Sequence, residues 1–230
     1  MPLPLKPIET RRLYQLIADR IRALIQGGDF PAGTRLPPER DLAAQLGVSR
    51  PSLREALIAL EIDGSVEIRM GSGVYACAQP ARAAVQTSAL GDSPTELMDA
   101  RAAVEGAIAM QAAARATPEM LARLREHLDA MKSDIESRKV PTLNDRLFHV
   151  TLAEIAGNMV LARMVGDLFE ERHSPITERL RVRSENQQSW RIALAEHEAI
   201  YLAIEARDPL GAAAAMRTHL KASRDRWVSD

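Results

Sequence analysis

Two short amphipathic segments separated by Gly47 and Val48 restrict the fold of this chain more than any other feature. The first, LPPERDLAAQLG, spans residues 36–47 and has Pro38 in its first turn, where a missing backbone N–H costs no hydrogen bond. The second begins at Ser49, a residue type that caps helix N-termini, and its apolar residues recur at helical spacing: Leu53, Ala56, Leu57 and Leu60. Two helices joined this closely predict a helix-turn-helix.

The flanking sequence extends this motif on both sides. Residues 8–27 carry apolar side chains at helical spacing and end at the stretch GGDFPAG. After the third helix, SVEIRMGSGVYA (residues 65–76) alternates apolar and polar residues around a GSG turn, which is typical of a β-hairpin. Three helices and a hairpin predict a winged helix-turn-helix domain over residues 1–78. Residues 79–93 lack periodicity and are expected to form a linker.

Residues 94–230 predict a different architecture. Apolar residues recur at helical spacing between short breaks that contain proline, glycine or asparagine. Because each connection is short, consecutive helices should pack antiparallel. The expected fold class is therefore mainly α, with a winged helix-turn-helix followed by an antiparallel bundle of six to seven helices. These helices are expected near residues 95–115, 118–137, 142–156, 158–172, 187–206 and 209–228.

Composition limits the cellular setting and the class of protein. The chain has 230 residues, one cysteine and a formal net charge of -1. The single Cys77 cannot form an internal disulfide, which fits the reducing cytoplasm. No signal peptide is evident, and no apolar run approaches the about 18 residues of a membrane helix, so we expect a soluble cytoplasmic protein. The near-neutral charge argues against a nonspecific nucleic-acid binder.

Arginines and hydroxyls nevertheless cluster at the helix-turn-helix. Arg50 and Arg54 lie four residues apart on one helix face, and Arg35 and Arg40 precede them. A helix N-terminus with free N–H groups, hydroxyls and paired arginines suits phosphates and guanine edges, and Gly71 at the hairpin tip would let backbone approach a minor groove. The alternative is a solvated face, because this half of the chain carries ten basic against nine acidic residues.

The stretch from Leu36 to Ala76 resembles the winged-helix domain of GntR-type bacterial transcription regulators, and the helical half resembles the ligand-binding domain of their FadR subfamily. The resemblance covers nearly the whole chain and implies a homodimeric regulator that binds double-stranded operator DNA. It implies DNA contacts from the positions that match the family motif: Arg40, Ser49, Arg50, Ser52, Arg54 and Gly71. Pro51 departs from the pattern, because relatives often have serine or threonine there, so one hydroxyl contact is lost.

Three histidines and one aspartate have spacings that would bring them together. Asp145 and His149 are four residues apart, hence on one helix face. His197 and His219 each lie 11 residues from Asp208, at the break between the last two helices. In an antiparallel pair they reach the same level and, after about three turns, face the same way. One carboxylate and three imidazoles suit a divalent transition metal, with zinc expected first and nickel or manganese as alternatives.

The resemblance implies the same four metal ligands, because they match those of the metal-binding subgroup of the FadR type. It also implies that Arg101 faces the effector pocket, where a guanidinium could clamp a carboxylate. The residues alone leave open a surface pair between Arg101 and Glu105. His127 and His173 have no such partners and are expected at the surface. The arginines from residue 171 to residue 190 are either a solvated face or further anion-binding groups.

These observations predict a DNA-binding regulator, and we expect a repressor whose operator affinity responds to a small carboxylate at the metal centre. Residues 54–75 are most similar to regulators of hexuronate and aldarate use, which favours a sugar acid; lactate, another small hydroxy acid and a dicarboxylate are alternatives. A DNA-binding protein with a purely structural metal is a rival. A metal hydrolase is not expected, because Asp145 would be a ligand rather than a base and no readable motif sets a glutamate beside the cluster.

Overall fold

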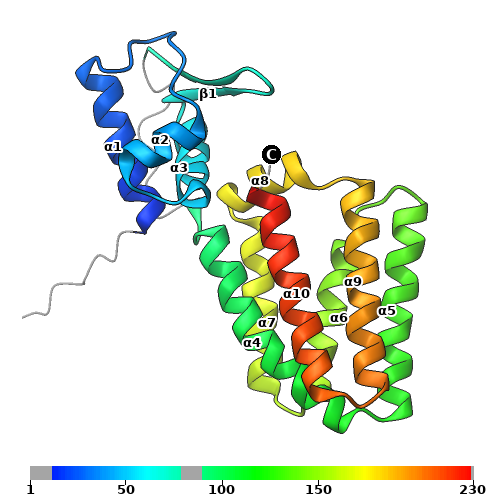
Figure 1. The fold of residues 1–230 in the computed structure, drawn as a ribbon. Coiled ribbons are helices and arrows are strands. Elements are labelled where there is room, and N and C mark those ends of the chain that lie inside the picture. The colour runs from blue at the N-terminus through cyan, green and yellow to red at the C-terminus, as the bar shows by residue number, and fades with distance from the viewer. Residues whose placement is uncertain (1–11, 79–89, 229–230) are drawn as a thin grey trace, which may run out of the picture. The chain divides into compact units, whose positions relative to one another are not determined.

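The computed structural model of this chain describes residues 12–78 and 90–228. These residues belong to two compact units, and the chain passes from the first to the second between Ser93 and Pro94 (Figure 1). Residues 8–11 of the first expected helix and residues 79–89 of the expected linker lie outside the described part. The remaining linker residues belong to the first unit, where Leu90 is buried and the Ser93 hydroxyl donates to Glu55 at 2.8 Å.

The first unit is a winged helix-turn-helix, as the sequence predicts. Its elements are α1 (Leu13–Gly27), α2 (Glu39–Leu46), α3 (Arg50–Asp63) and an antiparallel hairpin of β1 (Val66–Arg69) and β2 (Gly73–Ala76). Pro38 precedes α2 as its N-cap rather than lying in its first turn. Gly47 ends α2 with a left-handed φ of 70°, which a glycine adopts at little cost. Ser49 caps α3, since its Oγ accepts from the Ser52 N–H at 3.2 Å.

The core of this unit forms where α1 packs on α3. The four apolar residues expected on the inner face of α3 are all buried: Leu53, Ala56, Leu57 and Leu60. On α1 the buried residues include Ile17 and Ile21, whereas Leu13 and Leu16 are about half exposed. Helix α3 also contacts β1 of the hairpin.

The second unit is a helical bundle whose helices run side by side (Figure 1). Over residues 94–228 the structure has seven α-helices, within the expected range of six to seven. They pack around a buried core of alanine, leucine, isoleucine, methionine and phenylalanine side chains, with α10 against both α4 and α9. The seven are α4 (Pro94–Arg115), α5 (Pro118–Glu136), α6 (Thr142–Ile155), α7 (Met159–Glu170), α8 (Pro175–Ser184), α9 (Gln187–Glu205) and α10 (Pro209–Val228).

Two local features differ from the sequence prediction. Helix α8 is not among the six predicted helix ranges, although its arginine-rich segment was interpreted as a possible solvated helix face; only Ile176, Thr177 and Leu180 of its ten residues are buried. The helix predicted to end near residue 172 ends as α7 at Glu170 and continues as a 3-10 turn over Glu171–His173. No helix in the described part of the chain combines the length and apolarity needed to cross a membrane.

Candidate metal centre and nucleic-acid interface

Four buried polar side chains from three helices meet inside the bundle. Asp145 and His149 lie one turn apart on α6, His197 lies on α9 and His219 on α10. One ligand atom from each residue lies within 4.8 Å of the others. The approach of His197 to His219 has the geometry expected from their equal separation from Asp208. The bundle therefore gathers one carboxylate and three imidazoles around a common centre.

The outer neighbours of the three imidazoles determine which nitrogen faces this centre. Each Nδ1 has an oxygen beside it on the outer side of the cluster: Glu105 Oε2 at 2.5 Å from His149, the Ala193 carbonyl at 2.7 Å from His197, and Glu196 Oε2 at 2.8 Å from His219. Carbonyl and carboxylate oxygens only accept hydrogen bonds, so an oxygen this close favours the tautomer with the proton on Nδ1, although the contact at His149 lacks hydrogen-bond geometry. Each Nε2 is then left with a lone pair toward the centre, the arrangement usual for metal-binding histidines.

The central atoms fit a cation. His149 Nε2 and His197 Nε2 lie 3.2 Å apart, and Asp145 Oδ1 lies 3.0 Å from His197 Nε2. When the imidazole protons are on Nδ1, the lone pairs of the two Nε2 atoms and of the carboxylate oxygen point toward one another. These lone pairs repel each other unless an additional proton or a metal ion lies between them. Imidazole nitrogens and a carboxylate oxygen are suitable ligands for zinc, nickel and manganese, so the residues present fit such an ion.

The protonation of the histidines supports this fit. Burial and the neighbouring His197 lower the pKa of His219 to about 3, so its imidazole is neutral near pH 7 and able to bind a metal. The pKa of His149 moves the other way: burial lowers it, but Glu105 and Asp145 raise it further, above its ordinary value. A metal ion at this centre therefore competes with a proton at His149, and its affinity should fall in acid.

Arg101 lies beside the metal centre rather than at the surface. Its side chain is buried and its Nε donates to Glu105 Oε1 at 2.7 Å, so the expected pair with Glu105 exists but is internal. Arg101 Nη2 is buried without a hydrogen-bond partner, and Arg101 lines the same pocket as Asp145 and His149. Its guanidinium is thus available to an anion in that pocket.

Arg172 is a second buried arginine of this pocket, and sequence reasoning did not single it out. Its Nη1 donates to Asp145 Oδ2 at 2.9 Å and its Nη2 to Glu185 Oε1 at 3.0 Å. The Phe169 ring lies near both guanidiniums, with the Cζ atoms of Arg101 and Arg172 at 5.0 and 4.8 Å from its centroid. The interpretation of this segment as a solvated face is therefore wrong for Arg172, which the 3-10 turn after α7 carries inward.

Two glutamates adjoin the cluster, although no readable sequence motif indicated them. Glu105 contacts His149 and Glu196 contacts His219. Arg226 holds Glu196 in turn, through Nη1 at 2.7 Å and Nη2 at 3.0 Å. Both glutamates lie at the outer nitrogens of the imidazoles, away from the Nε2 atoms. They orient ligands, and neither is placed as a general base beside the centre.

The pocket over this centre is small. Its cavity volume is about 40 Å³. A water needs roughly 10–15 Å³ on this measure, so the cavity holds only a few water-sized groups. Besides the ligands it is lined by arginines, hydroxyls and an aromatic ring, including Arg101, Arg172, Ser184, Glu185, Ser189, Trp190 and Arg226. Its chemistry suits a carboxylate that carries hydroxyl groups.

The residues predicted to contact nucleic acid lie on two parts of the first unit. Ser49, Arg50 and Ser52 gather at the N-terminus of α3, where Ser49 and Arg50 are exposed and Ser52 is partly exposed. The hydroxyls of Ser49 and Ser52 lie 2.8 Å apart and hydrogen-bond to each other. This helix end therefore presents hydroxyls, a guanidinium and backbone N–H groups together.

Arg54 is less exposed than the sequence suggested. Its Nε and Nη2 both donate to Glu39 Oε2, at 3.2 and 2.7 Å, and its side chain is only 12% exposed. The glutamate fixes the direction of the guanidinium. Arg40, by contrast, has a side chain 85% exposed and contacts Asp41 at 3.2 Å. Arg40 can thus reach outward, whereas Arg54 is held in one orientation.

The remaining predicted residues, Gly71 and Arg35, lie in the hairpin turn and beside the hairpin. Gly71 lies exposed in the turn with φ of 69°, a left-handed conformation that favours glycine. Arg35 is exposed and pairs with Tyr75 through an isolated β-bridge beside the hairpin. A Cβ atom added at Gly73 would lie only 2.5 Å from Arg35 Nε. The absence of a side chain at Gly73 therefore leaves space for the Arg35 guanidinium.

His127 and His173 lie apart from the cluster of metal-type ligands, as expected. His173 is exposed, while His127 is only partly exposed and its Nε2 lies 3.2 Å from the Thr151 hydroxyl.

Comparisons with known proteins place both units. Residues 13–76 match bacterial regulatory proteins of the gntR family, and residues 96–222 match the FCD domain. The chain is 32% identical to the Uxu operon regulator of Haemophilus influenzae, over 91% of this chain and 80% of that protein. It is also 32% identical to the Exu regulon transcriptional regulator of Escherichia coli K12, over 93% and 83% respectively.

Among solved structures, Streptococcus agalactiae GntR is similar with a TM-score of 0.50 and 26% identity, over 92% of this chain and 98% of that one. The two curated relatives are transcription regulators rather than enzymes, in agreement with the sequence analysis. This chain therefore belongs to the gntR family of bacterial regulatory proteins, as a DNA-binding transcription regulator of the FadR subfamily with an FCD domain.

Proposed function

We propose that this regulator is a homodimeric, metal-dependent repressor whose affinity for operator DNA is controlled by a small carboxylate, most suitably a sugar acid. The observation that carries the proposal is the buried Asp145–His149–His197–His219 centre, which opens into a pocket where Arg101 has an unpartnered N–H. A repressor that binds operator DNA would act in the cytoplasm.

In this proposal the first unit reads DNA with α3 and the hairpin. Arg50, Ser49 and Ser52 would contact phosphates or base edges from the N-terminus of α3. Arg54, held by Glu39, would present a fixed guanidinium suited to a guanine edge. Arg35 and Arg40 would bind phosphates, and the Gly71 turn would approach the minor groove. A dimer would place two copies of α3 in successive major grooves of a near-palindromic site.

The second unit would sense the acid. Asp145 and the three histidines would hold the metal, which would supply a Lewis-acid charge for a carboxylate oxygen. Arg101 would donate its unpartnered N–H to the same carboxylate, and Ser184 and Ser189 would face the acid's hydroxyls. The acid can shift the DNA-binding units only by the difference between its affinities for their two arrangements.

A thermal-shift panel with DNA binding as the second readout tests this function. The zinc-loaded chain is heated with glucuronate, galacturonate, galactarate, lactate or succinate, each with and without chelator. Binding to the folded state raises the melting temperature by mass action. We expect one acid to raise the melting temperature and the chelator to abolish this rise. The same acid should release the protein from a DNA sequence that has been selected for binding to it.

Arg101→Gln should lose the acid response while still binding that DNA, and Arg50→Gln should weaken DNA binding while keeping the acid response. An acid response that ignores the chelator would refute the metal's part in sensing. DNA affinity that ignores every acid would favour the rival, in which the metal is only structural.

A further inference from the structure

We propose that Glu185 is a built-in occupant of a second anion site that adjoins the pocket, formed by Arg172, which lines the pocket, and Arg181 behind it, and that this site takes the distal carboxylate of a dicarboxylic effector. The inference rests on the proposed sensing function and specifies the class of acid. The effector would replace Glu185 when it binds, so Glu185 would act as a competitor that selects for a second carboxylate.

The contacts of Glu185 show that the two arginines form a carboxylate site. Arg181 donates from Nε to Glu185 Oε1 at 2.8 Å and from Nη2 to Oε2 at 3.0 Å, a bidentate pair. Arg172 Nη2 adds a third bond to Oε1 at 3.0 Å. The side chains of Arg172 and Arg181 are only 6% and 13% exposed, so the site is largely desolvated.

Glu185 differs from the other carboxylates at this pocket in having no part in the metal centre. Asp145 is one of the four candidate ligands, and Glu105 and Glu196 hold the Nδ1 atoms of His149 and His219. The ion pairs found for Glu185 in the described part of the chain join it only to arginines. Its departure would thus leave the histidines and their outer partners in place.

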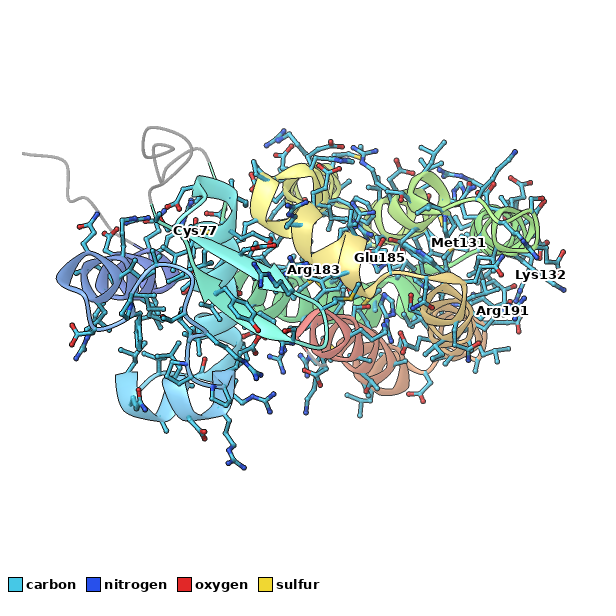
Figure 2. All side chains as sticks on the ribbon, turned by 90° about the horizontal axis from the view of Figure 1, so that it is seen from above. Cys77, Met131, Lys132, Arg183, Glu185 and Arg191 are labelled. Carbon is cyan, nitrogen blue, oxygen red and sulfur yellow. The ribbon has the colours of Figure 1, made fainter. Side chains whose placement is uncertain are left out.

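The backbone around Glu185 can accommodate such a departure. Glu185 caps the C-terminus of α8 in an extended conformation, two residues before α9 begins, and its N–H donates to the Arg181 carbonyl at 2.7 Å. In the view along the bundle, Glu185 lies among the helices, whereas Lys132 lies at the outer edge (Figure 2). Its side chain is 16% exposed, so part of it already reaches solvent.

The size of the pocket gives Glu185 a reason to move. The space that water-sized groups can occupy in the pocket is only about 40 Å³, and Glu185 is one of the residues that line it. Displacement of Glu185 enlarges the cavity and frees two guanidiniums at the same time. Arg172 Nη1 would still donate to Asp145 Oδ2, and Arg172 Nη2 would donate to the incoming carboxylate. The two carboxylates would then be bridged by one guanidinium. An acid anchored at the metal and Arg101 could therefore place a second carboxylate there.

Calorimetric titration of the zinc-loaded full chain with galactarate and gluconate tests the proposal. These six-carbon polyhydroxy acids differ in one terminal carboxylate and in the configuration of one hydroxyl group, so each acid is compared with itself between wild type and variant. Glu185→Gln removes the competing charge, and Glu178→Gln, at an exposed position of α8, is the matched control. If Glu185 occupies the arginine site about 90% of the time, its removal should tighten galactarate binding about tenfold. Gluconate binding should change less than about threefold, and Glu178→Gln should change neither.

Arg181→Gln should weaken galactarate binding and have little effect on gluconate. Hydrogen exchange on the wild-type chain provides a second measurement. Galactarate should speed exchange of the Glu185 backbone amide, because release of the Glu185 side chain loosens the hydrogen bond from this amide to the Arg181 carbonyl. Equal or weaker galactarate binding by Glu185→Gln, or parallel changes for both acids, would overturn the second anion site while leaving acid sensing intact. If neither acid bound either form, the proposed sugar-acid sensing would fail and this inference with it.

Discussion

Replacement of Glu105 by glutamine tests how the protein holds His149 at the metal centre. The carboxylate accepts from Arg101 Nε through Oε1 and lies against His149 Nδ1 through Oε2. A glutamine has one acceptor and one donor end. If its oxygen faces His149, its NH₂ meets the Arg101 donor; if its oxygen faces Arg101, its NH₂ forces His149 Nδ1 to accept. The second arrangement moves the proton to Nε2 and blocks that nitrogen as a ligand.

The expected magnitudes follow from the burial of this pair. Arg101 and Glu105 have side chains 3% and 1% exposed, so the loss of one charge leaves a buried, uncompensated guanidinium. Removing one partner of such a pair costs about 3–5 kcal/mol of stability. Loss of a carboxylate that orients a metal-binding histidine lowers metal affinity by about 10–100-fold. Each factor of ten corresponds to about 1.4 kcal/mol.

Urea unfolding of the metal-free chain measures the first effect, and zinc titration against a competing chelator measures the second. Glu198→Gln is the control, because Glu198 neighbours His197 on α9 and pairs with Arg125 at the partly exposed surface, at 2.6 Å. That pair is worth about 0.2–1 kcal/mol, and its loss should leave zinc affinity unchanged. If Glu105→Gln kept its zinc affinity within about threefold, the claim that Glu105 orients His149 would be refuted.

Three further predictions concern acid stability, DNA binding and packing. The pKa of Glu196 is about 2, because His219 and Arg226 lower it more than burial raises it. The stability that Glu196 contributes is therefore present above its unfolded pKa and is lost as the pH falls from about 4.5 toward 2. Glu196→Gln should flatten that loss in urea titrations from pH 7 to pH 3, and an unchanged slope would contradict this assignment. Arg50→Gln should weaken operator binding and, if Arg50 contacts a phosphate, reduce the slope of log affinity against log salt by about 1; an unchanged slope and affinity would remove Arg50 from the interface. Phe148→Ala should cost about 3–5 kcal/mol in chemical unfolding, because the ring is fully buried and lies edge-on to His197 at 5.0 Å between centroids; a loss below 1 kcal/mol would show that the bundle closes around the gap.

Elements that depend on periodicity and on turn residues could be predicted from the sequence. The glycine at position 47, the Ser49 cap and the regular apolar positions of α3 determine a helix-turn-helix locally. The meeting of His197 and His219 followed from their equal separation from one turn, which needs only antiparallel helices. The meeting of these two residues with Asp145 and His149 depended on the packing of α6 against the last two helices, for which the resemblance supplied the expectation.

The missed residues share a different property: their role depends on burial of charge rather than on spacing. The sequence of the arginine-rich segment does not distinguish Arg172, which is buried, from Arg183, which is exposed. The 3-10 turn over Glu171–His173 is what directs Arg172 inward. Glu105 was visible as a partner of Arg101, but its second contact comes from α6, far along the chain. A useful signal would have been the number of arginines and glutamates that could form pairs inside the bundle. Such residues must neutralise one another there, because a single uncompensated buried charge destabilises the fold.

That neutralisation explains what a metal ion would add to this pocket. Among the described residues in the pocket and directly behind its lining, four guanidiniums pair with four carboxylates: Arg101, Arg172, Arg181 and Arg226 with Glu105, Asp145, Glu185 and Glu196. The arginines therefore supply hydrogen-bond direction but no net charge. A divalent ion on Asp145 and the histidines would add two positive charges in a site of low dielectric, where they attract an anion far more strongly than in water. Exchange of Glu185 for an effector carboxylate leaves the charge at Arg172 and Arg181 unchanged, so it contributes selectivity at little electrostatic cost. Affinity for the acid would then come from the metal, and preference for a second carboxylate from the residue that the acid displaces.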